Sequence, residues 1–128
     1  MDSKRKAYLV ADFALDKKAE DLVVLDMHKV SSFCDYFIIC SASSTRQVRA
    51  IADGIEEGLV KLGISPRSVE GKSDGVWLLL DYADIIVHIF YAPMREFYEL
   101  EKLWQDAKKV RLSTLRKNEK KGGRRNNN

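Results

Sequence analysis

The apolar positions near the N-terminus predict one helix followed by two buried strands. From Lys4 to Lys18, apolar side chains recur at the three- and four-residue spacing of an amphipathic helix. The stretches from Asp21 to Met27 and from Tyr36 to Cys40 are instead short runs of branched and aromatic residues. Because such runs are typical of strands covered on both faces, we expect these two at the centre of a sheet.

A second helix is predicted from its cap and from its apolar spacing. Ser44 followed by Gln47 has the form of a capping box, in which the serine hydroxyl accepts a hydrogen bond from the backbone N–H three residues later. Helix-spaced apolar residues then continue from Val48 to Leu62. Gly63 follows, and glycine readily adopts the left-handed conformation that ends a helix.

The next part of the chain predicts a β-hairpin. A short extended segment, Arg67 to Glu70, and the polar turn Gly71 to Gly75 precede an apolar strand from Val76 to Leu80. Asp81 to Asp84 is a turn-forming stretch, and the apolar run from Ile85 to Tyr91 returns the chain antiparallel to the first strand.

A last helix completes the predicted fold. It begins near Pro93 and ends before Val110. The order of elements predicts an α/β (α+β) fold, with a mixed five-stranded sheet flanked by helices. Residues 1–110 form its single domain. Residues 111–128 form a basic tail that has too little apolar surface to fold, so we expect it to be disordered.

Charge is divided unevenly along the chain, whose net charge is +3. From Arg111 onward there are seven Lys and Arg residues against one acid, a net charge of +6. The body before it has 15 basic and 18 acidic residues, and its segment from Glu70 to Asp106 has eight acids against three bases. A folded surface that binds nucleic-acid phosphates has the opposite sign, so we expect the acidic segment to meet a basic partner.

The chain also carries the marks of a cytoplasmic protein. Its longest apolar run, near Ile85 to Ala92, falls well short of the roughly 20 residues that span a bilayer, and no secretory signal is evident at the N-terminus. We therefore expect a cytoplasmic location, with Cys34 and Cys40 as buried reduced thiols.

Residue types suited to catalysis or metal binding occur only in isolation. His28 and His88 lack the neighbouring Cys, Asp or Glu pattern of a metal site. No spacing supports Cys34 and His88 as a nucleophile and its base. The chain has no glycine-rich phosphate loop, and we expect no cofactor. These observations favour a protein that acts by binding.

Two segments have residues that could bind an ion. Ser41 to Ser44 joins a strand to a helix N-terminus, which can hold an anion, although small residues there also serve to cap the helix. Asp81 and Asp84 can bind a divalent ion, although carboxylates beside a tight turn more often accept hydrogen bonds from backbone amides. We expect the second interpretation for both segments.

Several separate motifs, in a fixed order, carry a family resemblance over roughly Lys4 to Val110. They are Lys18-Ala19-Glu20-Asp21, Val23-Val24-Leu25-Asp26, Ser31-Ser32-Phe33-Cys34-Asp35-Tyr36-Phe37, Ser44-Thr45-Arg46-Gln47-Val48, Val69-Glu70-Gly71, Trp77-Leu78-Leu79-Leu80-Asp81-Tyr82, Val87-His88-Ile89-Phe90 and Arg95-Glu96-Phe97-Tyr98-Glu99-Leu100-Glu101-Lys102-Leu103-Trp104. Together they resemble the ribosomal silencing factor, or Iojap, family.

The resemblance implies a fold related to that of the nucleotidyltransferases and a role in translation. The family binds the large ribosomal subunit at large-subunit ribosomal protein number fourteen, on the subunit-joining face. It thereby obstructs docking of the small subunit and represses translation under nutrient limitation. Family members often form homodimers.

Two alternatives come from other classes of protein. A nucleotidyltransferase-like enzyme needs a Gly-Ser turn and an Asp-x-Asp motif on the next strand, whereas this chain has Cys40-Ser41-Ala42 and no such pair. An RNA-binding ribosome-assembly factor would use the basic tail to contact ribosomal RNA. We favour the silencing factor and expect no enzyme.

The resemblance and the charge pattern together predict a partner-binding site. Aromatic anchors rimmed by charges are typical of protein interfaces, although core packing also accounts for such rings. The predicted anchors are Trp77, Tyr82 and His88, and the predicted acidic rim is Glu70, Asp81, Asp84 and Glu96.

Overall fold

The computed structural model describes residues 1–113, apart from the side chains of residues 97, 98 and 101. The fifteen tail positions from 114 to 128, and with them most of the predicted disordered tail, lie outside the described residues. In chain order the elements are α1 (Ser3–Asp16), β1 (Glu20–Asp26), β2 (Tyr36–Ala42), α2 (Thr45–Val60), β3 (Ser68–Glu70), β4 (Trp77–Asp81), β5 (Ile85–Tyr91), α3 (Ala92–Tyr98), α4 (Leu100–Leu103) and β6 (Lys108–Val110).

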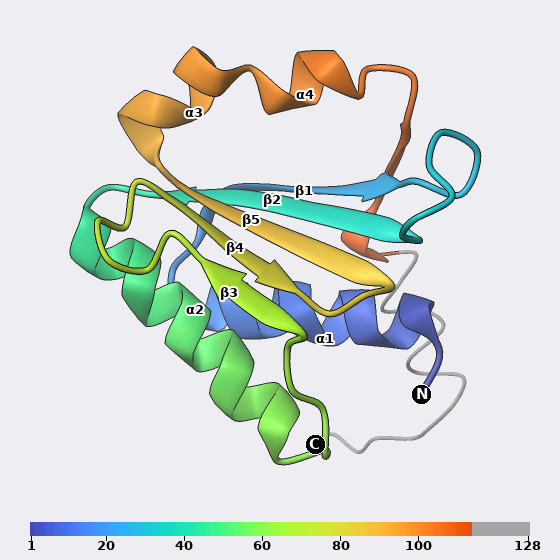
Figure 1. The fold of residues 1–128 in the computed structure, drawn as a ribbon, viewed down its shortest axis with the longest axis horizontal. Coiled ribbons are helices and arrows are strands. Elements are labelled where there is room, and N and C mark those ends of the chain that lie inside the picture. The colour runs from blue at the N-terminus through green and yellow to red at the C-terminus, as the bar shows by residue number, and fades with distance from the viewer. Residues whose placement is uncertain (114–128) are drawn as a thin grey trace.

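The strands form one mixed sheet in the order β3-β4-β5-β2-β1-β6. The β2–β5 pair is parallel, and the other four neighbouring pairs are antiparallel. Helices α1 and α2 cover one face, which we call the inner face, and α3 and α4 lie over the outer face (Figure 1). Strand β2 is buried at every position because it is central and covered on both faces, as its continuous apolar run predicted.

Each face of the sheet has its own core. On the inner face, Leu78 and Leu80 of β4 and Val87 of β5 are fully buried in one cluster with the apolar stripes of α1 and α2. On the outer face, Phe37 and Phe90 belong to a smaller cluster. Side chains alternate between the two faces along each strand, so both clusters arise from the same strands.

The predicted caps of α2 are present, with one change of partner. Ser44 Oγ accepts a hydrogen bond from the Gln47 N–H over 3.0 Å, as expected. The Gln47 amide group does not complete the capping box, because it donates to the carbonyl of Lys17 beyond the end of α1. Gly63 follows α2 with a φ of +80°. The N-terminal motif therefore joins α1 to α2 as well as starting α2.

The C-terminal part differs from the sequence prediction in two ways. The sheet has six strands and not five, because the segment Lys108–Val110 pairs antiparallel with β1. Its sequence, Lys-Lys-Val, has too few apolar residues to predict a strand. The prediction of a single last helix is also wrong, because Glu99 adopts a φ of +48° that separates α3 from α4. Leu112, assigned to the tail, packs against the inner core.

Within residues 1–113, no helix combines the length and the apolar character that crossing a membrane would require.

The loop between β3 and β4 is fastened to α2. Arg49 donates from its guanidinium to the carbonyls of Lys72 and Ser73, both over 2.8 Å. The ammonium group of Lys72 in turn forms ion pairs with Asp53 and Glu56 on α2, each at 3.3 Å. Gly71 opens this loop in the left-handed region, with a φ of +80°. Bonds donated by α2 to the loop and by the loop to α2 therefore fix the segment that leads into β4.

Replacing Gly71 with alanine is expected to lower the free energy of unfolding by about 3 kcal/mol or more. A Cβ atom there would lie 2.0 Å from the carbonyl oxygen of Trp77, in addition to the backbone strain. Gly63→Ala is the matched control, since Gly63 has the same φ but no atom within 4 Å of the added Cβ. That variant should lose only about 1 kcal/mol. Equal losses in urea unfolding would contradict the close approach.

Candidate partner-binding site

A partly exposed apolar surface lies on the outer face beside the β3 edge of the sheet. The register aligns Glu70 with Leu79 across β3 and β4, and Asp81 with Ile86 across β4 and β5. Directly paired residues point to the same face. We call these four residues and Trp77 the outer-face patch; all except the exposed Glu70 are half-buried.

Two of the predicted anchors are interior residues. Tyr82 is 5% exposed and belongs to the inner core, so its ring points away from the outer-face patch. Burial strongly raises the pKa of its hydroxyl. His88 points to the outer face, but it is only 4% exposed. Neither ring offers a partner much surface in this structure, and only Trp77 of the three lies at the patch itself.

His88 supports the patch from beneath. The indole N–H of Trp77 donates to His88 Nδ1 over 3.1 Å. The imidazole also packs on Phe37, with ring centroids 4.7 Å apart, and Trp77 stacks on Phe90 at 5.1 Å. Trp77 is thus held in place through both a hydrogen bond and a stack.

Burial also sets the protonation state of His88. Desolvation lowers the pKa of His88 to about 4, so its imidazole is neutral near pH 7. A neutral ring that accepts at Nδ1 carries its proton on Nε2. Nε2 is buried and has no hydrogen-bond partner. The tautomer that suits Trp77 therefore leaves one donor unused.

The predicted acidic rim is divided among different surfaces. Glu70 and Asp81 are on the outer face, whereas Asp84 pairs with Lys6 of α1 at 2.9 Å on the inner side. Glu96 is exposed on α3, beyond the opposite end of β5. The fold brings Glu70, Trp77 and Asp81 to one face of the sheet and places Tyr82 and Asp84 on the other side, while Glu96 belongs to α3 and not to the sheet.

Asp81 acts as a turn carboxylate, as the sequence analysis expected. Its Oδ1 accepts a hydrogen bond from the Ala83 N–H over 2.7 Å, where Ala83 has a φ of +76°. Its other oxygen lies 3.0 Å from the guanidinium of Arg67. Asp81 therefore stabilises the hairpin and already has a cation beside it, so Glu70 is the freer charge of the two.

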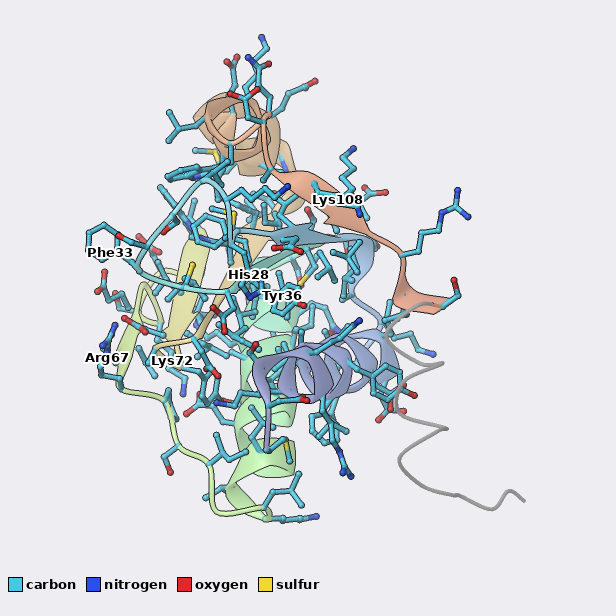
Figure 2. The ribbon with its side chains drawn as sticks, turned by 90° about the vertical axis from the view of Figure 1, so that its right-hand side faces the viewer. His28, Phe33, Tyr36, Arg67, Lys72 and Lys108 are labelled. Carbon is cyan, nitrogen blue, oxygen red and sulfur yellow. The ribbon has the colours of Figure 1, made fainter. Side chains whose placement is uncertain are left out.

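Three apolar residues near this surface were not among the predicted anchors. Ile86 was read only as a strand residue, and the period-two alternation of β4 places Leu79 beside Trp77. Phe33 is 89% exposed in the loop between β1 and β2. That loop is held to the hairpin turn, since the Asp35 N–H donates to the Asp84 carbonyl over 2.7 Å. In Figure 2, Phe33 and Arg67 lie along the same side of the molecule.

The strand-to-helix segment Ser41 to Ser44 is occupied by the protein's own groups. Ser44 caps α2, and the hydroxyl of the buried Ser41 accepts a hydrogen bond from Arg95 Nη1 over 2.9 Å. The same nitrogen donates to the Asp21 carbonyl over 2.6 Å. Arg95 of α3 thus ties the ends of β1 and β2 together, and the segment serves as the connection that was expected.

Comparison with known families agrees with the fold and the motif series. The family model described as "Ribosomal silencing factor during starvation" matches residues 1–128. The chain belongs to the ribosomal silencing factor family. The ribosomal silencing factor RsfS of Bacillus subtilis is 41% identical over 107 residues, which cover 84% of this chain and 91% of that protein.

Two further relatives of the family extend the comparison. A crystal structure of protein CV0518 from Chromobacterium violaceum superimposes with a TM-score of 0.80 at 30% identity, covering 82% of this chain and 88% of that one. A mouse protein named "Mitochondrial assembly of ribosomal large subunit protein 1" is 35% identical over 95 residues, which cover 69% of this chain and 40% of that protein. The bacterial relative is named as a regulatory factor and not as an enzyme.

In this member of the family, the buried His88 should make stability depend on pH. Its folded pKa lies below the unfolded value, so its contribution is full above about pH 6.5 and is lost as pH falls towards 4. The free energy of unfolding should drop by about 3 kcal/mol over this range. His88→Gln keeps an acceptor for Trp77 and cannot titrate, so urea unfolding of that variant should lack this drop.

His28 provides a control of opposite sign. Its hydrogen bond to Asp26 and the charges of Asp26 and Asp35 raise the pKa of His28. Its contribution is therefore full below about pH 6.5 and is lost as pH rises through the folded value. His28→Gln should leave the acid-side drop intact. A wild-type profile that stays flat from pH 6.5 to 4 would contradict the burial of a neutral His88.

Proposed function

We propose that this protein binds the large ribosomal subunit through large-subunit ribosomal protein number fourteen and blocks subunit joining. The outer-face patch is the contact surface in this proposal. Membership of the ribosomal silencing factor family supports action on the ribosome, and the name of the mouse relative refers to the large subunit. The observation that carries the proposal is the half-buried Trp77 beside Leu79 and Ile86, bordered by the exposed carboxylate of Glu70.

The chemistry of the patch suits a basic protein partner. Half-buried aromatic and aliphatic side chains on a rigid strand lose little conformational freedom on binding, and their remaining surface is desolvated by the partner. Trp77 is already fixed by His88 and Phe90. A ribosomal protein that lies on RNA is expected to be basic. Glu70 would then steer the encounter and fix its orientation more than it would add affinity.

The proposed block is steric and needs no chemical step. A protein seated on the subunit-joining face occupies volume that the small subunit needs. The residues of the outer-face patch are only half-buried, and the patch lies on a sheet face next to an exposed loop, so a partner can reach it. Translation under nutrient limitation would be repressed in proportion to the fraction of large subunits that carry the bound protein.

Glu70→Lys and Leu79→Ser should each weaken binding to the purified ribosomal protein. Loss of the apolar contact at Leu79 should raise Kd by about tenfold. Reversal at Glu70 should mainly slow association and reduce its salt dependence. Binding would be measured by biolayer interferometry, and subunit joining by sedimentation of separated subunits mixed with each variant.

The chain offers a matched control for each change. Glu57→Lys reverses an exposed charge on α2, and Leu62→Ser removes an exposed leucine beyond the end of that helix. Both lie away from the outer face and should keep wild-type binding. Thermal unfolding identifies any variant that has lost its fold. Full subunit joining at saturating wild-type protein would overturn the proposal.

A further inference from the structure

A basic groove lies at the sheet edge opposite to β3. It is a cavity of about 390 Å³, lined by Lys4 of α1, by Asp26 and Tyr36 at the ends of β1 and β2, and by residues 108–111. In Figure 2 the strand that carries Lys108 lies above α1, and Tyr36 and His28 lie between them. The outer-face patch is several strands away, since β6 and β3 are the two edges of the sheet.

The unexpected sixth strand creates the groove. The antiparallel register sets Lys108 opposite Asp26 and Val110 opposite Val24. Val110 packs on the inner core with Val24, so Lys108 points to the same face, towards the N-terminal turn of α1. Lys4 enters from that turn, while Arg111 follows the strand. Cations that are about a hundred residues apart in the sequence thus line one hollow.

The groove has a strong positive charge. Its lining includes Lys4, Lys108, Lys109 and Arg111, against the single carboxylate of Asp26. Lys109 pairs with Leu25 of the outer core, so its side chain leaves the strand on the face opposite to that of Lys108. Asp26 is already engaged, because His28 donates to its Oδ1 from the backbone over 3.0 Å, and the ring Nδ1 lies 2.6 Å from the same oxygen. Among the described residues, no ion pair is formed by Lys4, Lys109 or Arg111.

Burial raises the pKa of Asp26, but the two bonds from His28 and the charge of Lys108 outweigh it and lower that pKa overall. A neighbouring hollow shares Asp26 and Lys108 and adds Lys29 and Asp106, so its two lysines are matched by two carboxylates. In the sequence, Arg111 of the groove is followed by the six other cations of the tail.

We propose that the basic groove binds the sugar-phosphate backbone of RNA. Unpaired lysine and arginine side chains on a folded edge donate to phosphate oxygens and release counterions when they do so. The groove has no array of exposed aromatic rings for stacking unpaired bases, which favours a duplex backbone over a single strand. This inference rests on the proposed function in one respect: the ribosome supplies the RNA. The outer-face patch and the groove can then act together, one on protein and one on RNA.

The test compares two full-length triple variants of equal charge. The groove variant is Lys108→Gln/Lys109→Gln/Arg111→Gln. The control is Lys18→Gln/Arg46→Gln/Lys61→Gln, which removes three exposed cations from other surfaces. Fluorescence anisotropy measures binding of a short labelled RNA duplex as a function of salt. Each lost phosphate contact lowers the slope of log K against log salt by roughly 0.7 to 0.9.

We expect the groove variant to bind the duplex about tenfold more weakly or worse, with a slope lower by about two, while the control changes neither. A third variant replaces the six cations of the tail beyond residue 113 with Gln. If that change abolishes binding while the groove variant binds normally, the groove proposal is overturned. Equal effects of the groove and control variants would also overturn it, because they would reflect net charge alone.

Two further arms identify the ligand and separate this inference from the proposed function. If poly-glutamate binds as tightly as RNA and depends on the same three residues, the groove is a site for acidic protein and the proposal fails. Binding to purified ribosomal protein fourteen, without RNA, should be unchanged in the groove variant. Failure of that protein contact in the wild type would refute the proposed function and leave the RNA result to stand by itself.

Discussion

The parallel pairing of β2 with β5 is the constraint on which the rest of the structure depends. It places the ends of both strands, Ala42 and Tyr91, at one end of the sheet. Helices α2 and α3 leave from these ends and cover opposite faces (Figure 1). Arg95 can reach Ser41 only because α3 starts beside the end of β2. A parallel pair needs a long connection, and here that connection contains α2, β3 and β4. Strands β3 and β4 carry most of the proposed contact surface.

The sequence predicted those parts of the fold that have strong local signals. The apolar runs of β2 and β5, the serine cap of α2 and the turn of Asp81 all depend on residues close together in the chain. Strand β6 could not be predicted, because its pairing with β1 holds a segment that has little strand character of its own. The break at Glu99 was missed for a related reason: a non-glycine residue with positive φ gives no sign in the sequence.

The candidate site was predicted less well than the fold, and burial explains why. Aromatic residues serve both as core and as interface, and the choice between these roles depends on which face of a strand they occupy. Trp77 and Tyr82 are five positions apart, and an odd separation along an extended segment places the two side chains on opposite faces. Charge counting along the chain had a similar limit. It averaged Lys108 and Lys109 into an acidic body, and it had no means of placing Lys4 beside them.

The position of His88 explains how a buried residue can matter for binding without touching a partner. A tryptophan on an exposed sheet face can adopt several rotamers, and its side chain loses conformational entropy when a partner selects one of them. The bond from the Trp77 indole to His88 and its stack on Phe90 restrict that choice before binding. A cationic imidazole would have no lone pair to accept this bond. Burial keeps the imidazole neutral near pH 7, so the hydrophobic surroundings of His88 preserve the acceptor that orients the exposed side of Trp77.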